Sequence, residues 1–404
     1  MPIPALQSPA SAGLDAAQLK QIDRHFQGHI DRGTISGALT LVARKGAVAH
    51  MSPLGMADAE RAKTTALDTI YRIYSMSKPI TSVALMQQYE RGLMQLDDPV
   101  HKYIPAWKDL RVFAGGNYPS YLTNAPERRM TVRDLLSHQS GLTYGFMERT
   151  NVDAAYRKLG VGGNGTLKEM ADKLATLPLE FSPGSRWNYS VSTDVCGHLV
   201  EIISGQPFDQ YLQANVFDPL KMEDTSFWVP EAKLPRFAAN YSTGASGLEL
   251  MDDPRASTYA KSPSFLGGGG GLVSTAGDYY RFCQALLNGG QLDSGRVLGR
   301  KTIDLMTANH LTSGGDLLSM ATGGFSEAPY VGVGFGLGFS VALDPAKGQI
   351  SGSPGEFAWG GAASTAFWID PKEELVVVFM TQLMAMTPNN FRRELKALVY
   401  AALD

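Results

Sequence analysis

The sequence predicts an α+β fold with one antiparallel sheet built from both ends of the chain. Strand hairpins lie near both termini, and an amphipathic helix accompanies each hairpin. From about residue 80 to residue 290 the chain shows helical patterns and long polar loops instead. A sheet must bury its apolar faces, so we expect the two terminal helices to cover it and a large, mostly helical region to be inserted.

This layout divides the 404 residues into two parts. We expect residues 1–85 and 295–404 to form the sheet domain, and residues 86–294 to form a mostly helical domain. An active site is expected in the cleft between them.

At the N-terminal end, residues 15–32 are predicted to form a helix because their apolar residues recur at helical spacing. This stripe consists of Leu19, Ile22, Phe26 and Ile30. A strand hairpin follows, in which residues 38–43 and 47–50 flank the turn Lys45-Gly46.

At the C-terminal end, residues 363–369 and 375–381 flank the turn 370–373 and predict a second hairpin. Its second strand is strongly apolar. Residues 391–403 are predicted to close the chain as a helix, whose apolar face consists of Leu395, Leu398 and Val399.

The composition is that of an ordinary globular protein, with 44% hydrophobic residues, 19% charged residues and a net charge of −3. No Lys/Arg-rich tract is present, so neither nucleic acid nor an anionic membrane is expected as a partner. No apolar stretch approaches transmembrane length, and the first residues show no secretory signal. Cys196 and Cys283 read as buried reduced thiols, so we expect a cytoplasmic protein. Nothing in the sequence predicts its oligomeric state.

The most informative motif is a Ser-x-x-Lys formed by Ser75 and Lys78, at the start of a predicted amphipathic helix over residues 76–91. One helical turn separates the two residues, so the amine leans back toward the hydroxyl. Serine is a weak nucleophile until a nearby base takes its proton, and helix N-terminal N–H groups stabilise developing negative charge. The alternative is that Ser75 caps the helix and Lys78 is solvated. The motif alone leaves both open.

A second candidate is Tyr189, in a loop that follows the turn Ser182-Pro183-Gly184. Beside a cationic lysine its phenolate form is favoured, and a phenolate can act as a general base. The alternative is an aromatic residue that anchors the core.

The third candidate is the segment Trp359-Gly360-Gly361-Ala362, at the opening of the C-terminal strand pair. Paired glycines on a strand let a ligand approach the backbone. The N–H groups of Ala362 and Ser75 could then form an oxyanion hole. The alternative is a bulge at a strand edge with a packed tryptophan.

Other catalytic patterns are weaker. The Gly-x-Ser-x-Gly motif of α/β-hydrolases is absent, and the seven histidines are scattered. His25 and His29 are four residues apart, but no glutamate lies between them to complete a metalloprotease motif. We therefore expect packed or solvated histidines there, and no metal site.

The order of the three motifs resembles that of the serine β-lactamase and penicillin-binding superfamily. The closest resemblance is to the family VIII carboxylesterases, which have the class C β-lactamase fold. This resemblance extends over nearly the whole chain and includes the sequence segments 135–142 and 270–276.

The resemblance implies that Ser75 is the acylated nucleophile and that Lys78 and Tyr189 form the proton-transfer pair. It leaves open which of the two is the base in each step. The backbone N–H groups of Ser75 and Ala362 would hold the oxyanion. The implied substrate is a small-molecule ester, and no cofactor is implied.

Two departures from the family pattern narrow the substrate. Val191 replaces the amide that would bind a β-lactam side chain, and Trp359-Gly360 replaces the cation and hydroxyl that would hold a carboxylate. Losing a charge-assisted contact costs about 1.5–3 kcal/mol. Trp359 offers an apolar wall instead, so short- to medium-chain neutral esters are expected, with weak β-lactamase activity left open.

The expected substrate-binding residues are Trp359, Gly360, Gly361, Val191 and Tyr144. Tyr144 follows a Ser-Gly-Leu turn and either lines the cleft or packs in the core. The loops around 112–125, 240–265 and 313–332 are expected to form the rim.

Other activities stay open on the same motifs. The acyl group could pass to an alcohol or amine, as in an acyltransferase or transesterase. A β-lactamase, a D-amino-acid peptidase and a catalytically silent binding protein are further alternatives, and the joint presence of Ser75, Lys78 and Tyr189 argues against the silent one.

Overall fold

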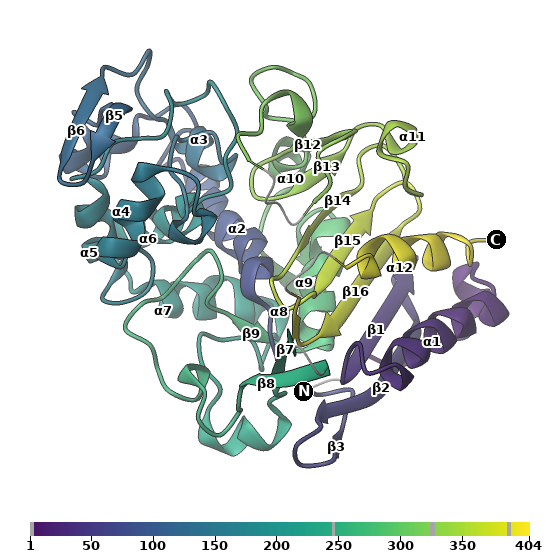
Figure 1. Ribbon diagram of the computed structural model, residues 1–404. Coiled ribbons are helices and arrows are strands. Elements are labelled where there is room, and N and C mark those ends of the chain that lie inside the picture. Colours follow the sequence, from purple (N-terminus) through teal and green to yellow (C-terminus); the bar gives the residue numbers. More distant parts are fainter. Residues whose placement is uncertain (1–3, 245–246, 324–327, 386–388) are drawn as a thin grey trace.

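The structure is a computed structural model that describes residues 4–244, 247–323, 328–385 and 389–404 (Figure 1). Its centre is an eight-stranded antiparallel sheet in the order β12-β13-β14-β15-β16-β1-β2-β3. The strands are β1 (Gly37–Arg44), β2 (Ala47–Asp58), β3 (Lys63–Thr64), β12 (Val333–Phe335), β13 (Ser340–Ala342), β14 (Phe357–Gly360), β15 (Ala366–Asp370) and β16 (Leu375–Thr381). The two chain ends meet where β1 pairs with β16, so the predicted α+β fold is confirmed.

Helices cover both faces of this sheet. On one face lie α1 (Ala16–Asp31) and α12 (Phe391–Tyr400), side by side in Figure 1. On the other lies α9 (Ala276–Leu287), which packs on β1, β15 and β16. Alternate residues of β16 divide between the two cores: Val377 joins the α1/α12 side, and Val376 joins the other. The strand is buried on both faces, which explains its uninterrupted apolar sequence.

The predicted terminal elements are present, with shifted ends. The helix expected over 15–32 is α1, whose Asp15 side chain caps the first turn. The first hairpin has a longer second strand, which runs to Asp58. In the second hairpin β15 begins only at Ala366, because the preceding residues form a turn.

Where the sequence predicted an amphipathic helix, the helix after the Ser-x-x-Lys motif is buried. It begins with a 3-10 turn over Tyr74–Met76 and continues as α2 (Ser77–Glu90). Its residues from Ser77 to Gln88 are all buried, so α2 is an interior helix rather than an amphipathic one. It packs against α6 (Ser192–Ser204) and α7 (Phe208–Leu212).

The rest of the chain contains short helices and small sheets. The helices are α3 (Val132–Leu136), α4 (Asn151–Leu159), α5 (Leu167–Leu174), α8 (Asp218–Leu220), α10 (Arg300–Met306) and α11 (Pro345–Gly348). The strands are β4 (Tyr71–Arg72), β5 (Val112–Asn117), β6 (Ser120–Asn124), β7 (Asn240–Gly244), β8 (Gly247–Asp252), β9 (Val273–Ser274), β10 (Gln291–Leu292), β11 (Gly295–Arg296) and β17 (Leu383–Met384).

Two hairpins, β5-β6 and β7-β8, lie where the sequence predicted polar loops. Most of their side chains are at least partly exposed, so the alternation that identifies a half-buried strand is missing. Within the described residues no helix is both long and apolar enough to span a bilayer. The division of the chain at residues 85 and 295 stays a prediction.

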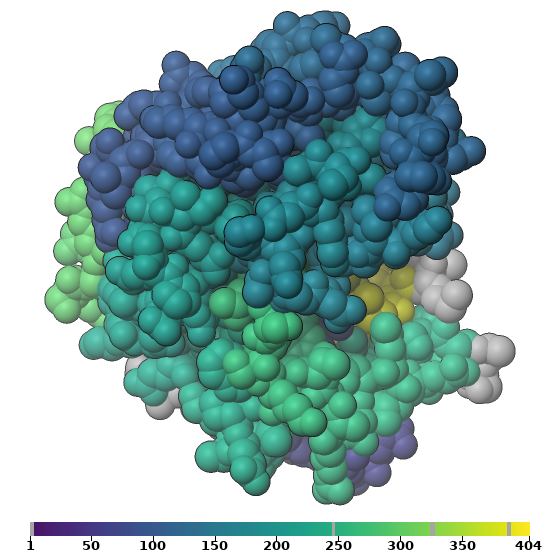
Figure 2. Space-filling model, turned by 90° about the vertical axis from the view of Figure 1, so that its left-hand side faces the viewer, coloured from purple at the N-terminus to yellow at the C-terminus, as the bar shows by residue number. Residues whose placement is uncertain are grey.

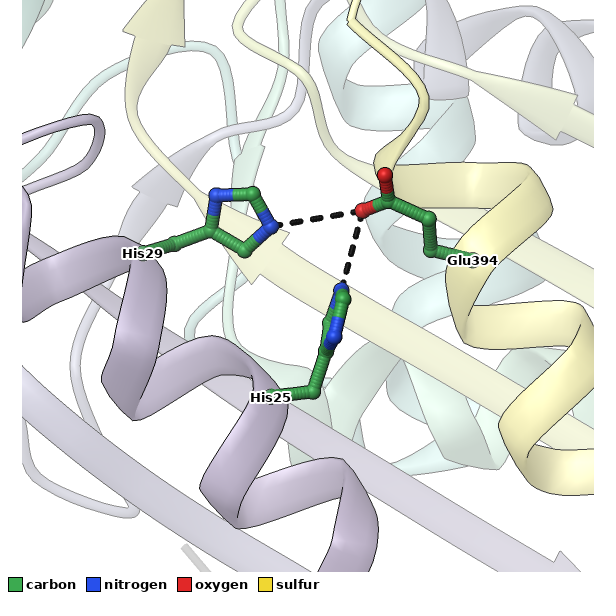
Figure 3. Close-up of side chains that lie close together, drawn as sticks. All are labelled: His25, His29 and Glu394. Atoms are coloured by element: carbon green, nitrogen blue, oxygen red, sulfur yellow. Dashed lines mark hydrogen bonds and ion pairs between the residues drawn. The ribbon is translucent and has the colours of Figure 1, made fainter.

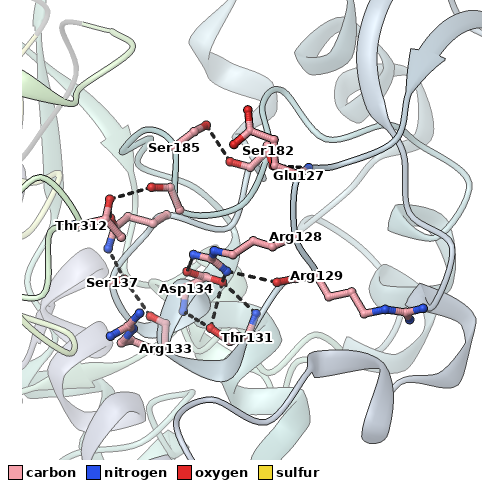
Figure 4. Close-up of polar contacts among 12 residues, drawn as sticks. Glu127, Arg128, Arg129, Thr131, Arg133, Asp134, Ser137, Ser182, Ser185 and Thr312 are labelled. Atoms are coloured by element: carbon pink, nitrogen blue, oxygen red, sulfur yellow. Dashed lines mark hydrogen bonds and ion pairs between the residues drawn. The ribbon is translucent and has the colours of Figure 1, made fainter.

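A polar network holds a tight loop of the helical region (Figure 4). The Arg128 guanidinium forms two ion-paired hydrogen bonds with the buried Asp134 carboxylate, at 2.6 and 2.7 Å. Asp134 also accepts from the backbone N–H of Thr131 at 2.8 Å, which caps α3. Nearby, the Glu127 backbone N–H donates to Ser182 Oγ at 2.9 Å. These contacts anchor the start of the loop 182–185.

The same loop requires a glycine at position 184. Gly184 has a left-handed backbone (φ 83°), and a Cβ there would overlap the Arg128 guanidinium. Its N–H donates to Gln139 O at 2.7 Å, and its carbonyl accepts from Thr312 Oγ1 at 2.6 Å. The chain therefore leaves this loop in a fixed direction, five residues before Tyr189.

The end of β14 lies very close to the segment that precedes Ser75. A Cβ on Gly361 would overlap the carbonyl oxygen of Ile73, so the two backbones touch only because residue 361 has no side chain. From α12, Arg392 Nη2 donates to the carbonyls of Gly361 and Thr365, both at 3.0 Å. The Gly361–Ile73 contact joins the C-terminal strands to the segment before α2, and Arg392 ties α12 to the same turn.

We predict that Gly361→Ala lowers the free energy of unfolding by about 1–3 kcal/mol, because the added methyl group forces the two backbones apart. Urea unfolding of the variant and the wild type measures this difference. Gly163→Ala is the matched control: nothing lies within 4 Å of a Cβ at that position, so its stability should not fall. Equal stability of Gly361→Ala and wild type would contradict the contact.

Candidate active site

Ser75 lies in the turn that leads into α2, and the backbone is bent at the preceding residue. Tyr74 has a left-handed conformation (φ 42°), which is costly for a residue with a side chain. Its phenol oxygen accepts from Asn240 Nδ2 at 3.1 Å, which helps to hold this bend. The Ser75 side chain is thereby turned to the wall of a cavity, and the residue is only 9% exposed.

Lys78 is buried beside Ser75, as the one-turn spacing predicted. Its Nζ donates to Ser75 Oγ at 3.3 Å and to the carbonyl oxygen of Gly269 at 2.6 Å. Gly269 belongs to the glycine run 267–271, which lines the cavity. A buried amine with a carbonyl acceptor this close is held in one orientation, toward the hydroxyl.

Tyr189 is brought to the same place by the fixed loop before α6. Lys78 Nζ lies 4.4 Å from the centre of its ring, within the range of a cation–π contact. Tyr144, Trp359 and His138 surround the ring, with centroids 5.3, 5.5 and 5.1 Å away. The structure thus gathers Ser75, Lys78 and Tyr189 around one cavity.

Ala362 lines this cavity together with Ser75. It follows directly after Gly361, whose contact with the segment before Ser75 was described above. Two backbone segments far apart in the sequence therefore meet at the wall of one cavity. An oxyanion hole built from the Ser75 and Ala362 N–H groups needs both residues there.

Of the other expected substrate-binding residues, some line the cavity and others do not. Tyr144 lines the cavity, and Phe146 stacks on it at a centroid distance of 4.7 Å. Trp359 is buried behind Tyr189 and is not among the lining residues; nor is the buried Val191. At Gly360 a Cβ would overlap the Arg392 guanidinium, so this glycine makes room for α12 rather than for a ligand.

The sequence analysis missed Asp194, a lining residue on the first turn of α6. Its Oδ1 accepts from the Gly269 N–H at 2.9 Å. Burial raises the pKa of its carboxyl, and the charge of Lys78 opposes this rise. Asp194 and Lys78 thus bind the backbone N–H and the backbone carbonyl of Gly269 respectively. In the sequence, an acid in a first helical turn looks like any residue that complements the helix dipole.

His138 is close to Tyr189 but packs as a core residue. Burial and the nearby Lys78 charge hold the pKa of its imidazole well below the usual range. Its Nδ1 lies 3.2 Å from Ser190 Oγ. A neutral ring in this position orders the segment around Tyr189.

The cavity has a volume of about 540 Å³, large enough for a small organic molecule. Aromatic side chains dominate its wall: Tyr74, Tyr144, Phe146, Tyr189, Phe227, Tyr259 and Phe265. Of the expected rim loops, 240–265 contributes residues, whereas 162–164 was not expected. Figure 2 views the side on which the teal segments meet the green ones, with yellow C-terminal residues visible between them.

The chain is similar in sequence or structure to several known proteins. Protein Rv1367c of Mycobacterium tuberculosis is 35% identical over 356 residues, which is 87% of each chain. Esterase EstB of Burkholderia gladioli is 29% identical and covers 92% of this chain and 93% of its own. Among solved structures, EstCE1, described as a hydrolase with promiscuous acyltransferase activity, has a TM-score of 0.80 at 26% identity, covering 95% of this chain and 99% of its own.

A family model covers almost all of the structure just described. The model of the Beta-lactamase family matches residues 22–401, from within α1 to the end of α12. The resemblance predicted from the three motifs is therefore confirmed. The chain belongs to the Beta-lactamase family.

Proposed function

We propose that this protein is a serine carboxylesterase that hydrolyses neutral small-molecule esters through an acyl-enzyme on Ser75. The observation that supports this most strongly is the convergence of Ser75, Lys78 and Tyr189 on one aromatic cavity that Ala362 also lines. The similarity to Esterase EstB supports the same reaction class.

In the first half-reaction Ser75 Oγ attacks the ester carbonyl carbon and loses its proton to Tyr189. The base is assigned to Tyr189 because Lys78 Nζ donates to both Ser75 Oγ and Gly269 O, so the amine presents hydrogens rather than a lone pair to the hydroxyl. Before the attack the lysine charge stabilises the Tyr189 phenolate, which becomes a neutral phenol when it accepts the proton. The N–H groups of Ser75 and Ala362 receive the negative charge on the carbonyl oxygen.

The attack produces a tetrahedral intermediate. When it collapses, the bond between the carbonyl carbon and the alcohol oxygen breaks, and the alcohol leaves with the proton from Tyr189. In the second half-reaction Tyr189 takes a proton from water, and the resulting hydroxide attacks the acyl carbon. The carboxylic acid is released, and Ser75 recovers its proton. The same groups of this chain therefore serve both halves.

The wall of the cavity supports a neutral substrate. Among its described lining residues Asp194 is the only charged side chain, and none is Lys or Arg. Lys78 lies behind the wall and is engaged with Gly269. A carboxylate on the substrate would lose its hydration without gaining a cation, whereas apolar groups would contact the aromatic rings.

The primary test is ester hydrolysis by Ser75→Ala. We expect kcat/KM for p-nitrophenyl butyrate to fall by at least about a thousandfold, because no acyl-enzyme can form. Ser82→Ala on the same helix is the matched control: Ser82 Oγ has no hydrogen-bond partner among the described residues, so activity should stay within about twofold. Full activity of Ser75→Ala would refute the assignment.

Substrate charge provides an independent test. With acyl chains of equal length, p-nitrophenyl hemisuccinate should react about 10–100-fold more slowly than p-nitrophenyl butyrate, measured as kcat/KM. The two esters differ in a terminal carboxylate that the cavity cannot pair. Equal rates would mean that a cation reaches the substrate, and the neutral-ester proposal would fail.

Acyl transfer is a second candidate, favoured by the similarity to EstCE1. It uses the same acyl-enzyme, with an alcohol in place of water. Adding a short alcohol during hydrolysis and separating the products distinguishes the two activities. For an esterase the carboxylic acid remains the main product, whereas a new ester as the main product would identify a transferase.

A further inference from the structure

Two histidines and a glutamate lie together on the face of the sheet opposite α2 (Figure 3). His25 and His29 extend from one side of α1, and Glu394 reaches them from α12. Glu394 Oε2 lies 2.9 Å from His25 Nε2 and 3.3 Å from His29 Nε2. The spacing of the histidines was visible in the sequence, but the glutamate comes from a helix more than 360 residues away.

The three side chains match the ligands of a transition-metal ion. Imidazole nitrogens and a carboxylate oxygen are common zinc ligands, and His-x-x-x-His on a helix presents two of them on one face. Bonds of about 2.0–2.1 Å in a tetrahedral site place donor atoms about 3.3 Å apart. The three donor atoms here lie within 4.8 Å of one another, so small side-chain rotations would close them on an ion.

The surrounding structure holds these side chains in place. The His29 ring meets the edge of Phe391 at a centroid distance of 4.8 Å, and the His25 ring meets that of His29 at 4.9 Å. The ends of the two helices are also tied, since the Asp15 N–H donates to the Ala402 carbonyl at 2.8 Å. A metal ion would therefore meet a partly preorganised site rather than mobile surface residues.

Access and charge also fit an ion. The side chains of His25 and Glu394 are 33% and 34% exposed, which leaves an open path and room for a water ligand. The Glu394 carboxylate supplies negative charge for a cation, and its Oε2 faces both imidazole rings. One contact opposes binding: Arg32 Nη2 donates to His29 Nδ1 at 3.2 Å. When Nε2 binds a metal, Nδ1 carries the proton, so the exposed Arg32 must turn away.

We infer that His25, His29 and Glu394 form a Zn²⁺ site that clamps α1 to α12. The ion replaces the direct His–Glu hydrogen bonds with three metal–ligand bonds, and water takes the fourth position. The clamp joins the first helix of the chain to the last one. It is separate from the cavity at Ser75 and does not depend on ester hydrolysis.

The test is a calorimetric titration of the full-length, chelator-treated protein with zinc chloride. We expect one ion per chain and, at about a hundredfold excess over Kd, a rise in Tm of about 2–4 °C. His25→Ala/His29→Ala should weaken binding at least about tenfold, and so should Glu394→Gln, which keeps the side-chain shape. Magnesium chloride should neither bind nor compete, because Mg²⁺ prefers oxygen ligands.

Two further variants sharpen the result. Arg32→Ala should tighten zinc binding, because it removes the donor that competes for His29 Nδ1. His101→Ala, which removes a histidine on a distant turn, should leave it unchanged. Circular dichroism checks that every variant is folded. Absence of stoichiometric binding by the wild type, or equally tight binding by the double histidine variant, would overturn the inference.

Discussion

The active site depends on one close backbone contact, between Gly361 at the end of β14 and the carbonyl of Ile73. Ile73 leads into the turn that carries Ser75, and Gly361 precedes Ala362, so this contact brings the nucleophile and the second oxyanion donor together. A side chain at position 361 would separate them. β14 pairs with β15, β15 with β16, and β16 with β1, so the site depends on the sheet in which both chain ends meet.

Near this contact, polar groups compensate the buried charge of Lys78. Burying Lys78 is costly unless acceptors replace its water shell. The Gly269 carbonyl supplies one acceptor at 2.6 Å, and Asp194 accepts a hydrogen bond from the N–H of the same residue. The glycine run therefore stabilises the Lys78 charge through a backbone carbonyl and also lines the cavity. Lys78 remains oriented toward Ser75 and Tyr189, where its charge favours a Tyr189 phenolate and a Ser75 alkoxide.

The sequence was sufficient for the fold class and for four of the residues gathered at the cavity: Ser75, Lys78, Tyr189 and Ala362. Ser75 and Lys78 were predictable because one helical turn sets their distance. Tyr189 and Ala362 followed from motif order and the family resemblance. Trp359 was expected as a wall of the pocket, but it packs behind Tyr189, because a sequence does not show which face of a short strand turns toward the cavity.

Residues that act through distant partners escaped prediction. Asp194 looks like a helix-start acid until Gly269 lies beside it, and Glu394 looks like a solvated residue until α12 packs on α1. The hairpins β5-β6 and β7-β8 were missed for a different reason, since strands with exposed side chains have no apolar alternation to reveal them. For Asp194 and Glu394 the missing information is a long-range contact.

The most direct measurement is mass spectrometry of the protein quenched during turnover of a slowly hydrolysed ester. The mechanism predicts a mass increase equal to one acyl group, located by peptide mapping on Ser75. Its amount should decay at the rate of acid release once the substrate is exhausted. An acyl group on another residue, or steady hydrolysis with no covalent intermediate when deacylation limits the rate, would contradict catalysis by Ser75.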